Sequence, residues 1–338
     1  MNRFDVDSLR TTGHLTTTTL IGQDLLHTLP ARHVVFGVDE SYLAHASINL
    51  MSIVRNAPTV LFHFHIITSS CLDPFSAAFR EIAEAHRFIL SIHRLSHELF
   101  ERAVQSKRFP QSIYYRLLAP SILQGHDQAL YLDADMVCLQ SLVPLWDQLK
   151  HGEVVAVVRD CAVGGPQRAA ALGMAGTDYF NSGMMLINLK AWRQLEVSEC
   201  ALTVIESQPT QMLYPDQDAL NIVLEGRVRF VDGRFNFLVK LEHSERDYAR
   251  QIPQDTVLLH YAGNNKPWQA WNGQPAVAFY RQVRADSPWR DHALDGPGNL
   301  RQARLMYRHH LRRREFVQGF IWRFRRALWR LTPFRRLF

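Results

Sequence analysis

Short apolar runs that alternate with segments of helical spacing restrict the fold of this chain more than any other feature. The run at 34–38, Val-Val-Phe-Gly-Val, is typical of a strand buried on both faces of a parallel sheet. Residues 42–55 follow it with apolar side chains at helical spacing. Further strands are predicted at 59–68, 89–95 and 129–132, and further helices at 73–88 and 112–123. The alternation predicts right-handed crossovers and an α/β fold around a mainly parallel sheet.

Two carboxylates, Asp133 and Asp135, come directly after the last of these apolar runs. Asp-x-Asp triplets arise by chance in a chain of this composition, so their position has to decide whether they matter. In open α/β sheets, ligands bind outside the carboxyl ends of the strands, and Asp39 also follows a predicted strand. Two Asp at i and i+2 on an extended backbone point to the same side. Asp133 and Asp135 are therefore candidates to share one cation.

Composition and missing motifs exclude several other classes of protein. A chain of 338 residues that is 47% hydrophobic and 21% charged can bury a sizeable core. Its four Cys lie far apart, which argues against a cysteine-ligated zinc site and against a disulfide framework. This use of cysteine indicates a reducing compartment. Neither a dinucleotide-binding glycine motif nor a P-loop follows any strand. We also find no secretory signal and no apolar run long enough to span a membrane.

The last 38 residues differ in charge from the rest of the chain. Residues 301–338 contain twelve Arg and one acid, a net charge of +11, so the other 300 residues of this +6 chain carry −5. As a helix, this segment places eight apolar residues on one arc: Phe316, Val317, Phe320, Ile321, Phe324, Ala327, Leu328 and Leu331. A basic amphipathic helix of this kind favours a membrane surface. Packing on the protein's own body and nucleic-acid binding are the alternatives, and large aromatic residues on one face favour lipid over nucleic acid.

Five sequence motifs, in a fixed order, carry a resemblance to a known family. They read VVFGVDESYLAHASINLMSI, YYRLLAPSILQGHDQALYLDADMVCL, YFNSGMMLINLKAWR, YPDQDALNIVL and LLHYAGNNKPW. Together they resemble glycosyltransferase family 8, which includes bacterial lipopolysaccharide galactosyltransferases and glucosyltransferases as well as the glycogenins. The resemblance runs from about residue 33 to about residue 272.

The resemblance implies a fold, a cofactor and a donor. It implies a nucleotide-binding α/β domain of the GT-A type, which we place at 31–275, between a loosely ordered leader at 1–30 and a basic C-terminal extension at 276–338. It also implies a UDP-sugar donor, retention of anomeric configuration and a divalent metal, usually Mn²⁺ with Mg²⁺ as the alternative.

Roles follow from the resemblance position by position. The metal ligands would be Asp133, Asp135 and His260. The residues that bind the donor nucleotide and its diphosphate would be Asp39, Ser41, Tyr42, Arg116, Ala134, Gly263 and Lys266. The residues around the reacting sugar would be Asp160, Asn181, Asp216 and Gln217. Ser41 departs from many bacterial relatives, which carry Asn there.

The expected reaction is transfer of a hexose, galactose or glucose, to a glycolipid, the growing lipopolysaccharide core. We favour a front-face mechanism in which departing UDP takes the acceptor proton and Gln217 stabilises the cationic sugar. Double displacement through Asp216 or Asp218 remains open. The expected location is peripheral, on the inner face of the cytoplasmic membrane, through residues 301–338. Alternatives are a soluble or protein-directed transferase of the glycogenin type and a non-catalytic membrane adaptor with a nucleotide-binding fold.

Overall fold

The computed structural model describes residues 5–26, 29–100, 110–149, 152–161, 164–241 and 247–331. The remaining parts of the predicted leader and tail, residues 1–4, 27–28 and 332–338, lie outside the described residues. The chain divides into two compact units. The first contains residues 1–238 and 255–260, and the second contains residues 239–254 and 261–338. This division differs from the predicted boundary at 275, because the second unit already begins at residue 239.

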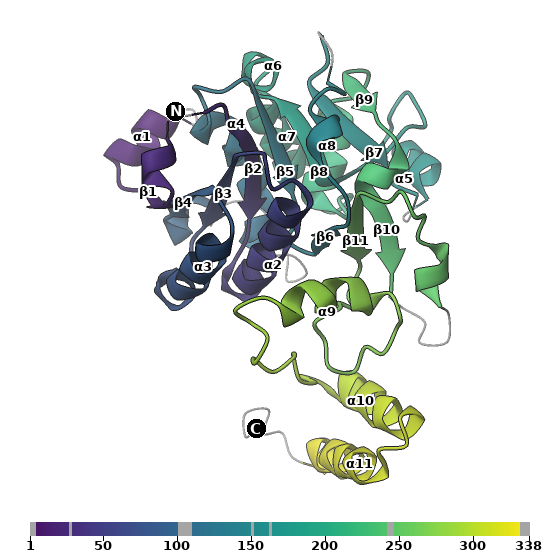
Figure 1. Ribbon diagram of the computed structural model, residues 1–338. Coiled ribbons are helices and arrows are strands. Elements are labelled where there is room, and N and C mark those ends of the chain that lie inside the picture. Colours follow the sequence, from purple (N-terminus) through teal and green to yellow (C-terminus); the bar gives the residue numbers. More distant parts are fainter. Residues whose placement is uncertain are drawn as a thin grey trace. The chain divides into compact units, whose positions relative to one another are not determined.

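An eight-stranded sheet with the order β1-β4-β3-β2-β5-β8-β7-β9 forms the centre of the first unit (Figure 1). Its strands are β1 (Leu15–Ile21), β2 (Arg32–Gly37), β3 (Phe62–Thr68), β4 (Ile89–Leu95), β5 (Gln128–Leu132), β7 (Val155–Arg159), β8 (Phe180–Asn188) and β9 (Val228–Phe230). Strand β2 runs parallel to β3 and β5, β3 to β4, and β7 to β9. The other three pairs are antiparallel. The prediction of an α/β fold with a mainly parallel sheet is confirmed.

A smaller sheet joins β10 (Phe237–Lys240), β11 (Leu258–Ala262) and β6 (Met136–Cys138), in that order. Strand β11 pairs antiparallel with β6, and His260 lies opposite Met136. The segment between β5 and β6 is only three residues long, and it carries Asp133 and Asp135. This short connection brings both carboxylates close to the start of the small sheet.

The helices of the first unit cover the large sheet. The α-helices are α1 (Val6–Thr11), α2 (Glu40–Asn56), α3 (Asp73–Ala85), α4 (Ala119–Ile122), α5 (Gly165–Ala171), α6 (Leu189–Gln194), α7 (Val197–Ser207) and α8 (Pro215–Val223). Short 3₁₀ turns are η1 (Gln23–Leu25), η2 (His97–Phe100), η3 (Gln111–Leu118), η4 (Val143–Leu145) and η5 (Gly233–Asn236). The helix predicted at 112–123 is therefore mostly 3₁₀, with one α-helical turn at its end. Pro120 lacks the N–H that a continuous α-helix would use, which fits this break.

The prediction that the leader is loosely ordered is wrong for residues 6–21, which contain α1 and β1. Asp5 accepts hydrogen bonds from the backbone N–H groups of Asp7 and Ser8 and so caps α1. Strand β1 pairs with β4 in antiparallel register from Leu15 opposite Leu95 onward. The Thr-rich composition of 16–19 hid this strand, since β1 is an edge strand with three consecutive exposed residues and few apolar ones.

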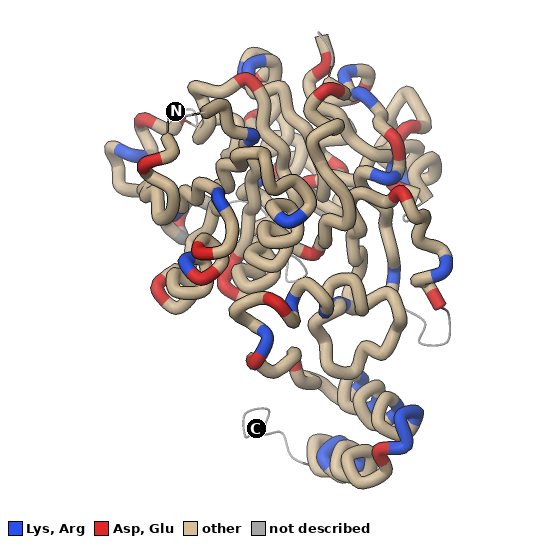
Figure 2. The backbone as a smooth tube through the Cα atoms, in the orientation of Figure 1, with Lys and Arg blue, Asp and Glu red and all other residues tan. Residues whose placement is uncertain are grey.

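The second unit contains η6 (Tyr248–Gln251), α9 (Val277–Ala285), α10 (Leu300–Arg312) and α11 (Phe316–Leu331). Helices α10 and α11 form a hairpin, and a side chain at Gly319 would come within 3.2 Å of Leu311. Figure 2 shows basic residues gathered on this hairpin, and all of them are Arg. In the described chain, no helix is both long and apolar enough to cross a bilayer.

The predicted apolar arc of the tail lies on the solvent side of α11. Phe316, Val317, Phe320 and Phe324 are each more than half exposed, and Ile321 and Leu328 are 40% exposed. Gly319, in contrast, is buried, and Trp322 and Trp329 are half-buried. Helix α11 therefore packs on α10 through another face and leaves the arc uncovered, contrary to the alternative in which the arc packs on the protein's own body.

Candidate active site

Three predicted metal ligands converge in the first unit. Asp133 follows β5, Asp135 precedes β6, and His260 lies on β11. One oxygen of each carboxylate and one ring nitrogen of His260 all lie within 4.8 Å of one another. The backbone N–H of Asp133 donates to the carbonyl of Gly183 at 2.8 Å, which ties this turn to β8. The structure thus brings together three residues, of which the first and the last, Asp133 and His260, are 127 positions apart in the sequence.

The hydrogen bonds around His260 determine which of its nitrogens faces a cation. Asn181 Oδ1 accepts from the backbone N–H of Gly183, so this atom is an oxygen. Asn236 therefore donates to it through Nδ2 at 2.9 Å and turns its own Oδ1 toward His260 Nδ1 at 3.0 Å. This contact places a proton on Nδ1 and leaves the lone pair of a neutral imidazole on Nε2.

His260 Nε2 faces Asp135 Oδ1 at 3.2 Å. A lone pair that faces a carboxylate is unfavourable unless the ring is protonated at both nitrogens or a cation lies between the two groups. A metal ion bound by Nε2 and by the carboxylates would satisfy both the lone pair of His260 and the charge of Asp135. Asn236 would hold the ring from the other side. The donor set therefore fits a divalent metal.

Gly183 keeps the space beside this triad open. A Cβ atom at Gly183 would lie 2.6 Å from the His260 ring, 2.7 Å from Asp133 Oδ2 and 2.9 Å from Asn181 Oδ1. Any other residue at this position would force two of the three candidate ligand groups to move. The glycine in the Asn-Ser-Gly segment thus has a steric reason to be there that the sequence alone did not reveal.

Arg116 connects the candidate metal triad to the predicted reacting centre. Its guanidinium donates to Asp133 Oδ1 at 2.9 Å and lies 3.0 Å from Asp216 Oδ2. It also donates to the Ser182 carbonyl at 2.9 Å and to the Ser182 hydroxyl at 2.6 Å. Burial raises the pKa of Asp216, and the Arg116 guanidinium opposes that shift. Arg116 is thus placed to position two carboxylates, in addition to its predicted role toward the donor.

Gln217 lies on α8 with its side-chain amide fixed at both ends. Its Oε1 accepts from Asn181 Nδ2 at 3.1 Å and from the backbone N–H of Ser182 at 3.0 Å. Its Nε2 donates to Asp160 Oδ2 and to the Tyr179 hydroxyl, both at 3.1 Å. Asp160 Oδ2 accepts from Asn181 Nδ2 as well, at 3.1 Å. The four residues predicted around the reacting sugar therefore lie in one buried network with Arg116 and Ser182.

Asp218, one of the two possible nucleophiles for double displacement, is fully buried. It pairs with Arg168 through contacts of 2.9 and 2.5 Å and accepts from the Tyr179 hydroxyl at 2.5 Å. The backbone N–H of Tyr214 donates to its Oδ2 at 2.9 Å. A carboxylate with these partners stabilises the start of α8 and is poorly placed to attack a sugar.

The predicted nucleoside contacts lie at the carboxyl end of β2. Asp39 Oδ1 accepts from the backbone N–H of Ser41 at 3.0 Å and from its hydroxyl at 2.6 Å, which caps α2. Asp39 Oδ2 accepts from Ser112 at 3.1 Å. Tyr42 packs edge-on against His45. Ala134, which lies between Asp133 and Asp135 in the sequence, is buried. Asp39 thus serves as a helix cap and still lies on the strand edge where ligands bind.

Gly263 and Lys266 lie in the second unit. Gly263 has φ of 87°, in the left-handed region that glycine adopts without strain. Lys266 Nζ donates to the carbonyl of Tyr261 at 2.7 Å, and its backbone N–H donates to Gln269 Oε1. These contacts order the loop that carries both predicted diphosphate ligands.

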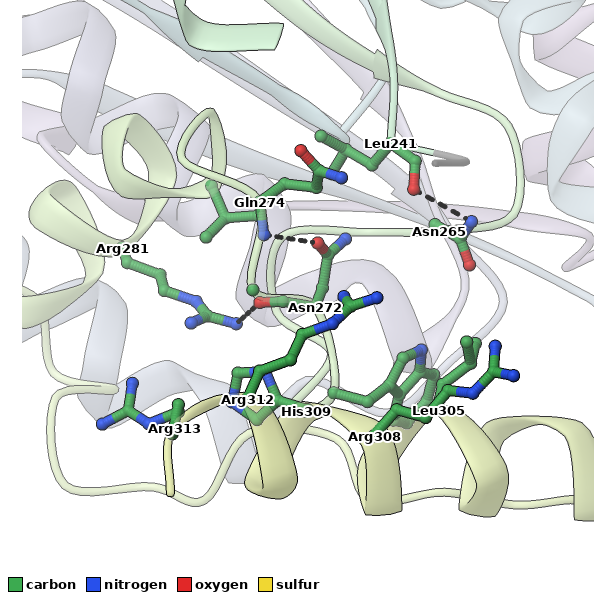
Figure 3. Close-up of a pocket in the computed structure, with 13 residues that line it drawn as sticks. Leu241, Asn265, Asn272, Gln274, Arg281, Leu305, Arg308, His309, Arg312 and Arg313 are labelled. Atoms are coloured by element: carbon green, nitrogen blue, oxygen red, sulfur yellow. Dashed lines mark hydrogen bonds between the residues drawn. The ribbon is translucent and has the colours of Figure 1, made fainter. Parts of the chain in front are cut away.

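A basic cavity of about 300 Å³ is a further feature of the second unit. Arg308, His309 and Arg312 of α10 line one side of it, and Asn272 and Gln274 line another (Figure 3). Its lining residues, all described, include no acid, and Trp271 contributes a buried indole N–H that lacks a hydrogen-bond partner. A cavity lined by several Arg and by no acid suits an anionic group.

The sequence profile of glycosyl transferase family 8 matches residues 33–272, and that of the family's C-terminal region matches residues 275–325. The chain belongs to glycosyl transferase family 8. The resemblance seen in the five motifs and the prediction of an enzyme, a hexosyltransferase, are confirmed.

Several relatives of this family 8 chain match over most of their length. A lipopolysaccharide 1,2-glucosyltransferase of Escherichia coli is 31% identical over 298 residues, 85% of this chain and 88% of the relative. The lipopolysaccharide 1,2-glucosyltransferase of strain K12 is 29% identical over 307 residues, 88% of this chain and 90% of the relative. The lipopolysaccharide 1,3-galactosyltransferase of Salmonella typhimurium is 27% identical over 295 residues, 85% of this chain and 88% of the relative.

Solved structures confirm the GT-A type of fold. The galactosyltransferase LgtC, in complex with donor and acceptor sugar analogs, superposes with a TM-score of 0.64 at 26% identity, covering 76% of this chain and 96% of LgtC. An active-site mutant of LgtC, in which a glutamine is replaced by glutamate, gives a TM-score of 0.62 at 25% identity with the same coverage.

Proposed function

We propose that this family 8 enzyme transfers galactose or glucose from a UDP-sugar to the core of a lipopolysaccharide, with a divalent metal at Asp133, Asp135 and His260 and with retention of anomeric configuration. The observation that carries the proposal is the single network that joins these three residues to Asn181 and Gln217, with Asp133 connected through Arg116 and Ser182. Chemistry that breaks a sugar–phosphate bond needs both parts, one for the leaving diphosphate and one for the sugar.

Mn²⁺ is the metal that this donor set favours, because mixed carboxylate and imidazole ligands suit it better than Mg²⁺, which prefers an all-oxygen shell. When bound, the ion would offset the negative charge that develops on the departing diphosphate. Arg116 holds Asp133 through Oδ1. The other oxygen, Oδ2, lies beside Gly183 on the same side as the His260 ring. Arg116 thus sets the direction in which this ligand presents its second oxygen.

The reacting centre supports a front-face mechanism. Gln217 is an amide, a poor nucleophile, and its hydrogen bonds to Asp160 and Asn181 fix its orientation. The carboxylate of Asp218 is engaged by Arg168 and Tyr179. In this proposal, the dipoles of Gln217 and Asn181 and the charge of Asp160 stabilise the cationic sugar carbon. The LgtC mutant adds support, since the active-site residue that was replaced in this related galactosyltransferase is a glutamine.

An anionic glycolipid is the acceptor class that the second unit supports. Three relatives are named as lipopolysaccharide glucosyl- or galactosyltransferases. The basic cavity beside α10 suits an anionic group, and α11 presents an apolar arc next to many Arg. Cationic residues and exposed aromatic side chains on one helix are the combination that holds a protein peripherally on an anionic membrane. We accordingly propose a location on the inner face of the cytoplasmic membrane.

A panel of UDP-sugars tests the proposal directly. Purified enzyme is incubated with each sugar nucleotide and Mn²⁺, with and without chelator, and UDP release is measured. We expect release with UDP-galactose or UDP-glucose, which stops when chelator is added and resumes when Mn²⁺ is restored. Release that continues in chelator would contradict the metal, and no release from either hexose nucleotide would contradict the donor class.

A further inference from the structure

A row of histidines crosses the first unit on one face of the large sheet. His33 on β2 lies opposite His63 on β3, and His65 follows on the same face of β3. His93 on β4 continues the row, and Thr17 on β1 ends it. The rings of His33 and His126 stand 3.7 Å apart, centre to centre. Five imidazoles thus gather at a place that the proposed transferase chemistry does not use.

Three of the five histidines, His33, His63 and His126, lie at the amino ends of their strands, away from the candidate active site. His33 and His63 are each the second residue of their strand, whereas Asp39 follows the carboxyl end of β2. His126 precedes β5, and Asp133 follows it. The parallel arrangement of β2, β3 and β5 therefore separates these three histidines from the Asp-Asp-His triad by the length of the strands. His65 lies in the middle of β3, and His93, opposite Ile67, lies near the carboxyl ends of the strands.

The ligand atoms of the cluster are already close together. One ring nitrogen each of His33, His63 and His65 lies within 4.8 Å of the others. His33 Nδ1 and His65 Nε2 are 3.0 Å apart. Two nitrogens bound at about 2.05 Å to one tetrahedral ion stand about 3.3 Å apart, so a ring movement of a few tenths of an ångström would admit the ion.

The geometry points to a second metal site, in which His33, His63 and His65 bind a borderline divalent transition metal of the Zn²⁺ class. Three imidazoles without a carboxylate are a donor set that Zn²⁺ accepts readily, and one that differs from the Asp-Asp-His set at the active site. A cavity of about 590 Å³, lined by His33, His63 and His126, leads to the cluster and would supply water as a fourth ligand.

A histidine that binds a metal through one ring nitrogen needs a hydrogen-bond partner for the other, and the cluster supplies such partners. His65 Nδ1 lies 3.0 Å from His93 Nε2, and His93 Nδ1 lies 3.0 Å from the Thr17 hydroxyl. A proton on each Nδ1 leaves the lone pair of His65 Nε2 toward the metal position. His63 is oriented by Ser91, 2.8 Å from its Nε2.

The rings also have the protonation state that metal binding needs. Burial and neighbouring histidines lower the pKa of His33 to about 3 and that of His63 to about 4, and burial keeps the pKa of His65 well below its ordinary value. The three imidazoles are therefore neutral at neutral pH, with lone pairs available.

Zn²⁺ titration of the full-length, tag-free protein tests the site. The Asp133→Asn/Asp135→Asn variant weakens the active-site triad and leaves every histidine in place. After chelator treatment and dialysis, calorimetry should show that this variant binds one Zn²⁺ per chain at the cluster. X-ray absorption should show a first shell that includes three histidine nitrogens at about 2.0 Å. On this background, His65→Gln should weaken Zn²⁺ binding at least tenfold, and the exposed control His292→Gln should leave it unchanged.

Two results would overturn the site. One is a carboxylate variant that binds no Zn²⁺, in which case the row is only a hydrogen-bonded chain of neutral rings. The other is a bound Zn²⁺ whose first shell lacks three histidine nitrogens. If His65→Gln does not fold, X-ray absorption on the carboxylate variant decides alone, because that protein keeps the whole cluster.

Discussion

At the scale of single residues, Asn181 is the centre of the site. Its oxygen accepts from Gly183 and Asn236, and its amide nitrogen donates to Asp160 and Gln217. Because the backbone N–H of Gly183 fixes which end of the Asn181 amide is oxygen, the orientation of Asn236 and the tautomer of His260 follow from it. One side-chain amide thereby links the proposed metal ligands to the residues proposed to surround the sugar.

The metal ligands can be tested by removing one charge. Asp135→Asn should lower the rate of UDP release by about a hundredfold or more, because the leaving diphosphate loses electrostatic stabilisation. Asp127→Asn, at the other end of β5 and exposed, is the matched control and should keep the normal rate. Equal rates for the two variants at saturating Mn²⁺ would rule out Asp135 as a ligand.

Gln217 can be tested by the stereochemistry of the product. Gln217→Ala removes the amide dipole but no nucleophile, so the rate should fall while NMR of the product shows the donor's anomeric configuration. Mass spectrometry of trapped wild-type enzyme should show no hexose attached to Asp216 or Asp218. A hexose bonded to either carboxylate would establish double displacement instead.

At the scale of elements, the sequence predicted regular, buried segments well and mixed ones poorly. Helix α2 was predicted at 42–55 and spans Glu40–Asn56, because its apolar spacing is long and unbroken. Strand β1 was missed, since Thr side chains on a half-covered edge strand carry little pattern. The role of Gly183 was also out of reach, because it depends on where His260 and Asp133 arrive from elsewhere in the chain.

Helix α11 is the element whose role can be tested alone. Phe324 is 65% exposed on the apolar arc, so Phe324→Asp should reduce binding to vesicles of anionic lipid in a sedimentation assay. Gln318→Asp adds the same charge on another exposed face of the helix and should bind nearly as wild type. UDP release in the absence of lipid should be the same for both variants. Equal vesicle binding would contradict insertion of the arc.

At the scale of the whole molecule, the features described above are divided between the two units. The carboxylate triad, the Gln217 network and the histidine cluster all belong to the first unit, whereas Lys266, the basic cavity and the amphipathic hairpin belong to the second. The sequence identified most of these residues through the family's motifs. It gave no sign of the histidine cluster, because only His63 and His65 are close in sequence, two residues apart on β3, and the other members come from separate strands and loops.

The buried histidines make the stability of the metal-free protein depend on pH. The pKa of His33 and that of His93 are lowered to about 3, and that of His63 to about 4, from 6.5. Below pH 6.5 the unfolded chain therefore binds protons that the folded chain refuses, and stability is lost as pH falls. Each of these histidines should lower the free energy of unfolding by about 1.4 kcal/mol for every pH unit below that point.

Urea unfolding between pH 7 and about pH 5.5, with chelator present, measures this loss before carboxylates titrate. His63→Gln should reduce the slope by roughly one proton, and His292→Gln should leave the slope unchanged. A pH-independent free energy of unfolding in this window would mean that the rings are solvated.

Strand β1 has a consequence for the colloidal behaviour of the protein. It occupies one whole side of β4, whose Ile89, Leu90, Ile92 and Leu95 are buried. A shortened chain that starts at residue 33, where the match to the family begins, would keep every candidate catalytic residue. It would also expose the N–H and C=O groups of β4 as an open template on which another chain can add a strand. Aggregation, and not loss of chemistry, would then limit the use of such a fragment, so the leader protects solubility.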